Sequence, residues 1–192
     1  MAGRHLKLDR DEMVRLTYEY GSDWAINHAK RILHLVSMLS DGTDYNEDAV
    51  WLAAYLHDWG GYQQWLVPGV EHYTRSAEVA REFLTKQNCP PDLMELVIEC
   101  IEFHHGGPSE RSIESILTAD ADALDLLGVV GAARIFAMNF RNLKNGFDAV
   151  KRYRNMSVAA ISTDKAHELA TERIKETDWF INAFLEETFG IY

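Results

Sequence analysis

Apolar residues recur at intervals of three and four along most of the chain, with polar faces between them. This spacing is typical of amphipathic helices, because residues three and four apart lie on one helix face. The apolar pair with most strand character, Val129-Val130, is too short and is flanked by glycines. The pattern predicts an all-α fold, with helices at residues 9–20, 22–39, 46–58, 71–84, 92–105, 112–125, 129–140 and 162–184.

The predicted helices fit one compact domain. With 192 residues and a hydrophobic content of 47%, the chain can bury a sizeable core. It has four prolines and no tract rich in serine and glycine, so we expect a single helical bundle over residues 1–192. Its core is expected at about residues 20–130, with the C-terminal helices of 131–192 packed on it.

Charge and composition narrow the functional classes. The formal net charge of −11 argues against a large nucleic-acid footprint, because that binding depends on clustered lysine and arginine. No window approaches the roughly 18 apolar residues of a membrane span, and Met1 to Arg10 is charged, so we expect no membrane association and a cytoplasmic protein. Cys89 and Cys100 form no CxxC pair and are expected to be ordinary thiols.

The most informative stretch is residues 51–61, which read WLAAYLHDWGG. A buried helix is expected to end at His57 and Asp58, because Gly60 stands where a helix stop is expected. At the last turn both side chains can reach one ion beyond the helix end, with further ligands from elsewhere in the chain. Alternatively, Asp58 is a plain C-terminal residue and His57 is a cap stabilised by the helix dipole.

Two further histidines are each followed three residues later by an arginine. His28 and Arg31 lie on the face of the second predicted helix that should look into the core. His72 and Arg75 lie in the first turn of the fourth, where they can point together at an anion. The alternatives are a hydrogen-bonded core histidine at position 28 and an ordinary solvated helix start at position 72.

Two later segments combine ligand-type side chains with apolar sequence. His104 and His105 precede a Gly-Gly-Pro break, where histidine also suits a helix end for dipole reasons alone. Asp120, Asp122 and Asp125 lie in a helix rich in Ile, Leu and Ala. Carboxylates are costly to bury there unless they are paired or bind a metal.

One basic cluster stands out in this acidic chain. We expect it to be a solvated face, and the alternative is a flap that contacts phosphates. Its members are Arg141, Lys144, Lys151, Arg152 and Arg154.

The order of these candidates resembles the HD superfamily of metal-dependent phosphohydrolases, named for its His-Asp doublet. Residues 52–58, LAAYLHD, are similar to the family's AALLHD signature. Residues 120–134, DADALDLLGVVGAAR, resemble the DADxLD...GxAR run of one branch, and residues 162–173 resemble that branch's NTExAKxLAxxR helix. The likeness covers about residues 20–185 and implies a compact helical bundle of the HD-domain type.

Carried over residue by residue, the resemblance implies four metal ligands: His28, His57, Asp58 and Asp122. Asp122 is preferred because it occupies the aspartate of the family's ADxL core; Asp120 would then orient a ligand or a water. Two histidines and two carboxylates suit a divalent ion such as Mn²⁺, Mg²⁺, Fe²⁺, Ni²⁺ or Zn²⁺ and do not choose among them.

The same resemblance implies a second metal or a phosphate contact at His72 and His104. His105 is the weaker candidate of its pair, because relatives often carry serine at that position and His104 keeps the family's spacing from Ile101. Arg134 is a further candidate for holding phosphate.

The implied activity is hydrolysis of a phosphate ester or anhydride of a nucleotide or similar small phosphate by metal-activated water. Asp58 or Asp120 would accept the water proton. Charge stabilisation is implied for His72, Arg31 and Arg75. The alternatives are a cyclic or linear nucleotide phosphodiesterase, and a non-catalytic nucleotide-binding or regulatory module. The aromatic final helix also permits a homodimer.

Overall fold

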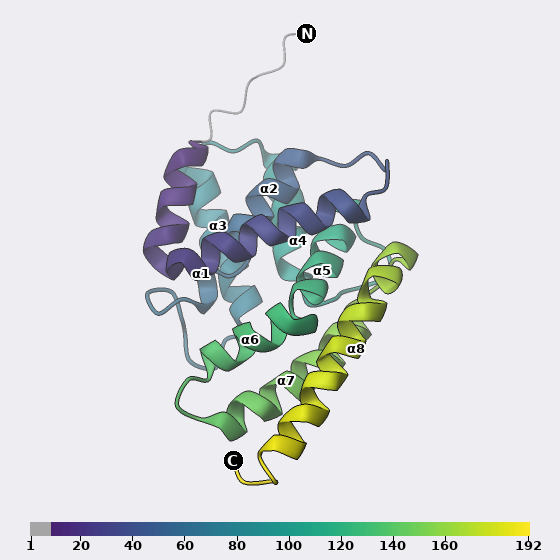
Figure 1. Cartoon of the computed structure of the whole chain (residues 1–192). Helices are drawn as coiled ribbons and strands as arrows, with labels where there is room; N and C mark the ends of the chain where they lie inside the picture. The colour runs from purple at the N-terminus through teal and green to yellow at the C-terminus, as the bar shows by residue number, and fades with distance from the viewer. Residues whose placement is uncertain (1–8) are drawn as a thin grey trace. The chain divides into compact units, whose positions relative to one another are not determined.

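A computed structural model describes residues 9–192, and it confirms the all-α prediction. Within these residues there are eight α-helices and one short 3₁₀ helix, and no strand (Figure 1). The helices are α1 (Arg10–Leu39), α2 (Glu47–Leu56), η1 (Trp59–Gly61), α3 (His72–Lys86), α4 (Pro91–Glu102), α5 (Ile113–Asp125), α6 (Gly128–Met138), α7 (Leu143–Ala160) and α8 (Asp164–Glu187). Most of the charged N-terminal stretch considered above falls on residues 1–8, outside the described part.

The chain divides into two compact units. The first ends at Thr118 and the second begins at Ala119, so the division falls inside α5. The single-domain organisation over residues 1–192 stays a prediction.

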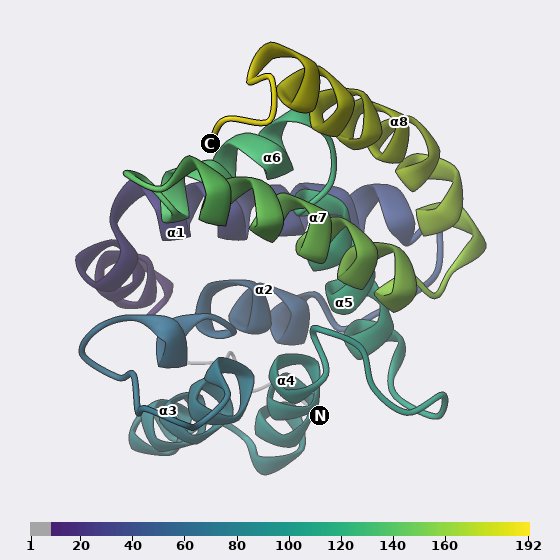
Figure 2. The same cartoon turned by 90° about the horizontal axis from the view of Figure 1, so that it is seen from below.

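The first unit is built around α2. Seven of its ten residues are buried, as expected for its nearly uninterrupted apolar sequence. It packs against α1 and α4, and α3 packs against α4 and η1. Figure 2 shows α2 lying between α1 and the α3–α4 pair. The residues that follow α2 therefore emerge in the middle of this unit.

A sharp bend divides α1, as Figure 1 shows. Asp9 caps the start of the helix by accepting a bond from the Glu12 amide. Ser22 then takes non-helical angles (φ 51°, ψ −154°), so the break predicted at Gly21 is a kink within one helix. Glycine suits this position because a Cβ on Gly21 would lie 2.6 Å from the ring of Tyr62. The straight second half of α1 carries His28.

In the second unit α6, α7 and α8 pack on one another. Helix α7 was not predicted, because its basic residues dominate the sequence from 141 to 154. Its buried side includes Phe147 and Val150. Two of the basic residues, Lys144 and Lys151, form ion pairs with Asp148 on the exposed side, which fits the solvated-face interpretation. None of the helices in residues 9–192 is long and apolar enough to cross a membrane.

Candidate metal centre

The His-Asp doublet lies where α2 ends. His57 is the C-cap residue, and its Nδ1 lies 3.1 Å from the carbonyl oxygen of Ala54. The last carbonyls of a helix have no partner within the helix, so the oxygen is available to accept this bond. A carbonyl can only accept, so Nδ1 carries the proton. In the neutral ring the lone pair is then on Nε2.

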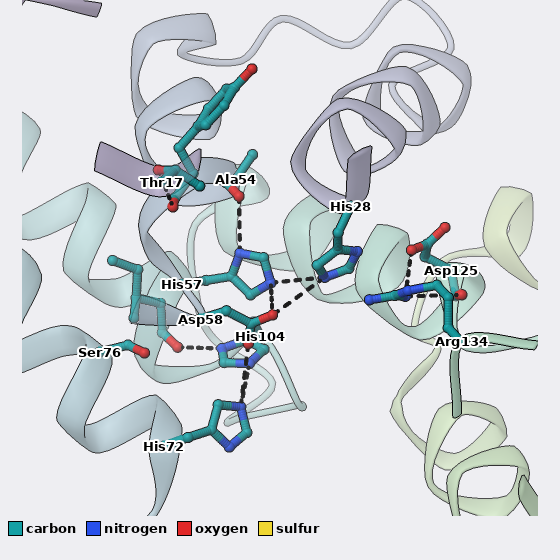
Figure 3. Close-up of polar contacts among 12 residues, drawn as sticks. Thr17, His28, Ala54, His57, Asp58, His72, Ser76, His104, Asp125 and Arg134 are labelled. Carbon is teal, nitrogen blue, oxygen red and sulfur yellow. Dashed lines mark hydrogen bonds and ion pairs between the residues drawn. The ribbon is translucent and has the colours of Figure 1, made fainter. Parts of the chain in front are cut away.

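His28 of α1 meets His57 across the core of the first unit. Their Nε2 atoms lie 3.1 Å apart, and both rings are almost fully buried. Oδ2 of Asp58 lies 3.7 Å from Nε2 of His28 and 3.5 Å from Nε2 of His57. Figure 3 shows the three side chains converging. Within residues 9–192, these residues form one of two groups whose ligand atoms lie close enough to hold an ion.

This spacing fits coordination chemistry. Two nitrogen ligands about 2.1 Å from a shared ion and about 90° apart lie about 3.0 Å from each other. The Nε2 atoms of His28 and His57 are 3.1 Å apart, with a carboxylate oxygen beside both. Two imidazoles and a carboxylate are a donor set for a divalent ion, so His28, His57 and Asp58 could hold one here.

The second group comprises His72, His104 and His105. His72 is the first residue of α3, and its Nε2 lies 3.2 Å from Nε2 of His104. Nδ1 of His104 lies 2.6 Å from the carbonyl oxygen of Ile101, near the end of α4, which fixes the lone pair on Nε2 as at His57. The candidates at positions 72 and 104 are thus brought together.

Asp58 lies beside both groups of histidines. Its Oδ2 faces His28 and His57, and its Oδ1 lies 3.7 Å from Nε2 of His72. The carboxylate is 30% exposed, whereas the rings of His28 and His57 are 3% exposed. One carboxylate therefore stands between two sets of imidazoles, on the side open to solvent.

Close contact between η1 and α3 positions these groups. The amide of Gly60 donates to Oγ of the buried Ser76, at 2.9 Å. A Cβ on Gly60 would lie 2.3 Å from the backbone nitrogen of Ser76 and 2.7 Å from the carbonyl oxygen of His72. Trp59 is tied to α1 by a 3.0 Å bond from its indole Nε1 to Oγ1 of Thr17. The sequence had suggested only a helix stop at Gly60.

Two arginines lie in the same unit as the histidines. Arg31 is partly buried on α1, one turn after His28. Arg75 donates from Nε to the carbonyl oxygen of Trp65 at 3.0 Å, and its Nη1 lies 2.7 Å from Glu78. The guanidinium of Arg75 is therefore held against the loop that precedes α3.

An ion pair joins α3 to α4, the helices that carry His72 and precede His104. Arg81 donates to Glu95 from both terminal nitrogens of its guanidinium, and the bond from Nη2 is 2.9 Å long. The hydrogen bond lowers the pKa of the Glu95 carboxyl and raises that of the Arg81 guanidinium. Both side chains are largely exposed, so solvent screens the pair.

The candidates on α5 from position 119 onward belong to the second unit. Asp120 is fully buried: Oδ1 accepts from the Ser162 amide at 2.8 Å, and Oδ2 accepts from the Thr163 amide at 3.0 Å and its hydroxyl at 2.6 Å. This carboxylate ties the start of α8 to α5. The base role of Asp120 stays a prediction, and these bonds favour a structural role.

The other carboxylates of this run are also buried. Asp125 pairs with Arg134, whose Nη1 also lies 3.3 Å from the Asp125 carbonyl oxygen (Figure 3). Arg134 is 9% exposed. Its guanidinium, which the family resemblance suggested for holding phosphate, is paired with Asp125. Asp122 is 4% exposed. Its assignment as a metal ligand stays a prediction that rests on the sequence pattern.

Neither cysteine joins the candidate centre. Burial raises the pKa of the Cys100 thiol far above its ordinary value, and burial also raises the pKa of the Cys89 thiol. A thiol binds metal and attacks as a thiolate, so the raised pKa disfavours the reactive form of both groups. Both cysteines are buried and free.

Comparisons with known proteins agree with the all-α fold. The model of a family described as HD domain matches residues 25–127, more than half of the chain. A predicted HD superfamily hydrolase from an uncultured Thermotogales bacterium superposes with a TM-score of 0.64 at 22% identity, over 93% of this chain and 92% of that one. YpgQ of Bacillus subtilis, solved in complex with ADP, superposes with a TM-score of 0.63 at 22% identity, over 95% and 99%.

One curated relative is longer than this chain. The tRNA (cytidine(56)-2'-O)-methyltransferase of Thermoplasma volcanium is 26% identical over 191 residues. The match covers 95% of this chain and 50% of that protein, so the chain spans about half the length of this relative.

Proposed function

The chain belongs to the HD domain family, and from that premise we propose that it is a metal-dependent phosphohydrolase acting on a nucleotide or a similar small phosphate. The observation that carries the proposal is the single carboxylate of Asp58 between two sets of converging imidazoles. Residues placed only to fill a core would not direct four or more donor atoms at common points.

His28, His57 and Asp58 would hold the first ion. When bound, a divalent ion lowers the pKa of a water molecule and polarises a phosphoryl oxygen. The helix-end carbonyl at Ala54 holds the ring of His57 in the tautomer that leaves Nε2 free to bind. Burial keeps water away from the two imidazoles, while Asp58 remains open to the substrate side.

We propose a second ion position at His72 and His104. Oδ1 of Asp58 faces His72, so this carboxylate can serve both positions, one oxygen to each. Two positive charges close together suit a phosphate group, because its oxygens carry the charge that must be neutralised. The same residues would bind the phosphate directly if one ion were present.

Neighbouring side chains would transfer protons and stabilise charge during the reaction. Asp58 lies beside both sets of imidazoles, and we assign it the proton of the attacking water. His72 is 30% exposed and lies at the outer edge of the centre, so with a single ion bound it would be the group that protonates the leaving oxygen. Arg31 and Arg75 would stabilise phosphate charge.

A nucleotide is the proposed substrate class for two reasons. YpgQ, a structural relative of the same fold, was solved with ADP. The chain carries a net charge of −11, so an anionic small molecule needs local positive charge, which the ions would supply. Phosphodiester hydrolysis and non-catalytic nucleotide binding are the alternatives that the experiment must separate.

The test uses the full chain, purified without chelator, beside Asp58→Asn and the control Asp44→Asn, which changes an exposed aspartate. Metal content is measured by elemental analysis, and phosphate or pyrophosphate release is measured with nucleoside mono-, di- and triphosphates and cyclic nucleotides. We expect one or two equivalents of divalent metal and turnover in the wild type and in Asp44→Asn, and loss of both in Asp58→Asn with helical circular dichroism unchanged.

Three other outcomes decide against parts of the proposal. Turnover of cyclic nucleotides alone would make the protein a phosphodiesterase. Stoichiometric nucleotide binding without turnover under several metals would make it a binding module. Absence of bound metal even after Mn²⁺ is supplied would remove the basis of the proposed chemistry.

A further inference from the structure

The loop between α4 and α5 carries His104 and is closed by hydrogen bonds at its base. Residues 103–112 connect the two helices. The carboxylate of Glu99, on α4, accepts a 3.2 Å bond from the amide of Ser112 and a second bond from the Ser112 hydroxyl. The same hydroxyl oxygen accepts a 3.1 Å bond from the amide of Ser115 and so caps the start of α5. The far end of the loop is therefore held against α4.

This closure brings Arg111, one residue before Ser112, to the carbonyl group of Phe103. Nη1 of Arg111 donates to the carbonyl oxygen at 3.0 Å. The amide of Gly106 donates to the same oxygen at 2.9 Å. A carbonyl oxygen has two lone pairs, so the two donors satisfy it fully. One donor from the turn and one from the far end of the loop thus fix the direction of this carbonyl.

The Phe103 carbonyl determines where His104 lies. A peptide bond is planar, so the carbonyl of Phe103 and the backbone nitrogen and Cα of His104 move as one unit. The buried ring of His104 is held separately by its Nδ1, 2.6 Å from the carbonyl oxygen of Ile101. Its Nε2 then lies 3.2 Å from Nε2 of His72 (Figure 3). A tilt of the Phe103–His104 peptide plane would displace this Nε2.

We propose that Arg111 is a positioning residue, which binds the Phe103 carbonyl and thereby holds His104 at the distance from His72 that two ligands of one ion require. The inference rests on the second ion position proposed above. A guanidinium suits this role because it stays protonated at any working pH and forms strong, charge-assisted hydrogen bonds. The effect passes through the backbone and needs no contact between Arg111 and the ion.

The direction of the effect on metal affinity separates positioning from simple electrostatics. A positive charge near a bound cation opposes its binding. Loss of the guanidinium charge alone would therefore tighten metal binding at the second position. Loss of a bond that positions a ligand would weaken it, by about 10- to 100-fold as for other outer partners of metal ligands. The two effects thus have opposite signs in one measured Kd.

The test uses the full chain, stripped of metal and titrated with Co²⁺, followed by calorimetry and by the visible absorption of the bound ion. The wild type is compared with Arg111→Met, which keeps an unbranched side chain but no donor, and Arg111→Lys, which keeps the charge and a donor. His72→Gln identifies the second equivalent. The controls are Arg15→Met, which removes an exposed arginine of α1, and Ser112→Ala, which removes the cap of α5 but keeps the Ser112 amide that bonds to Glu99.

We expect two equivalents of Co²⁺ in the wild type and in both controls. In Arg111→Met the first equivalent should bind unchanged and the second about 10- to 100-fold more weakly. The visible absorption of the second ion should also change, because the ligand geometry changes. Arg111→Lys should bind the second equivalent more tightly than Arg111→Met, since an ammonium group can donate to the same carbonyl.

Unchanged or tighter binding of the second equivalent in Arg111→Met would overturn the positioning role, and so would an Arg111→Lys variant that binds no better than Arg111→Met. Equal weakening in Ser112→Ala would attribute the effect to a loosened loop and would also overturn it. A wild type that binds one equivalent removes the second ion position together with the role of Arg111, while the first position of the proposed enzyme survives. Binding of no Co²⁺ overturns both proposals.

Discussion

His57 and His104 present their lone pairs by the same local arrangement. Each follows the end of a helix, and each places Nδ1 against the carbonyl oxygen three residues earlier, Ala54 or Ile101. A carbonyl near a helix end lacks its helical partner, so the bond satisfies both groups at once. Histidine at a helix end was expected on dipole grounds alone; the bond explains why these rings are also oriented for binding.

The hydrogen bonds of Asp120 favour a structural role over the base role implied by the family resemblance. Its oxygens accept three bonds from Ser162 and Thr163. In Asp120→Asn an amide nitrogen replaces one acceptor and leaves a buried donor unpaired, which costs about 1–3 kcal/mol. We expect a lower free energy of unfolding in a urea titration, with the metal content of the native protein unchanged.

Asp164→Asn is the matched control for Asp120→Asn. It makes the same change at an exposed residue in the first turn of α8, the helix whose start Asp120 contacts. It should unfold close to the wild type. Unchanged stability of Asp120→Asn together with lost hydrolysis would instead support the base role implied by the family resemblance.

Among the elements, the contact of η1 with α3 sets the distance between Asp58 and His72. A methyl group on Gly60 would lie 2.3 Å from the α3 backbone, which cannot move aside as a flexible side chain can. We expect Gly60→Ala to lower the free energy of unfolding by about 1–3 kcal/mol, as overpacking does. Binding of the second ion should weaken more than binding of the first, because α3 carries His72 but neither His28 nor His57.

Gly61→Ala provides the comparison for this change. Its Cβ would meet its nearest neighbour, on His72, at 3.6 Å, an ordinary contact. Thermal unfolding and Co²⁺ titration of the two variants should therefore differ clearly. Equal effects at positions 60 and 61 would show that loss of glycine, and not the close approach to α3, is responsible.

The Arg81–Glu95 pair makes the joining of α3 to α4 dependent on pH. The folded-state pKa of Glu95 is lowered, so the pair stabilises the fold above the ordinary glutamate pKa of 4.5, and the stabilisation is lost as the pH falls from there through the lowered folded-state pKa. We expect Glu95→Gln to cost less than about 1 kcal/mol at pH 7, because the pair is exposed.

The cost of Glu95→Gln should disappear at low pH. Urea unfolding at pH 7 and at pH 3 would measure this, with Glu82→Gln, an exposed residue of α3, as control. A cost of Glu95→Gln that stays constant between the two pH values would mean that the carboxylate charge does not contribute.

Helix periodicity and helix ends could be predicted for most elements because each helix has its own apolar face. The break at Gly21 and the start of α3 at His72 were predicted in this way. Helix α7 was missed, because exposed basic residues outnumber its buried ones and hide the periodicity. The place of Gly60 against α3 could not be predicted, since it depends on two elements meeting in space.

For the candidate centre, the order of histidines and aspartates along the chain identified the residues of the first group and two of the second. The closeness of His105 to His72 and His104 was not predicted, because the family resemblance gave no reason to expect a ligand at this position. The hydrogen bonds from the start of α8 to Asp120 could not be predicted either, since Ser162 and Thr163 are distant from Asp120 in sequence.

At the scale of the whole molecule, a bound ion should act as a crosslink between helices. The two groups of imidazoles come from α1 and from the ends or starts of α2, α3 and α4, so no unfolded chain presents them together. A ligand that binds only the folded state at 100 times its Kd stabilises that state by about 2.7 kcal/mol. We therefore expect Co²⁺ at that concentration to raise the Tm of the metal-stripped full chain, and EDTA to reverse the shift.

Asp58→Asn shows whether this stabilisation comes from the centre. The Tm of its metal-free form should be close to that of the metal-free wild type, because the side chain of Asp58 is partly exposed. Addition of Co²⁺ should then move its Tm little, since the shared carboxylate is missing from both positions. An equal rise in Tm for the wild type and Asp58→Asn would place the stabilising ion elsewhere on this acidic chain. The imidazole groups would then not be its binding site.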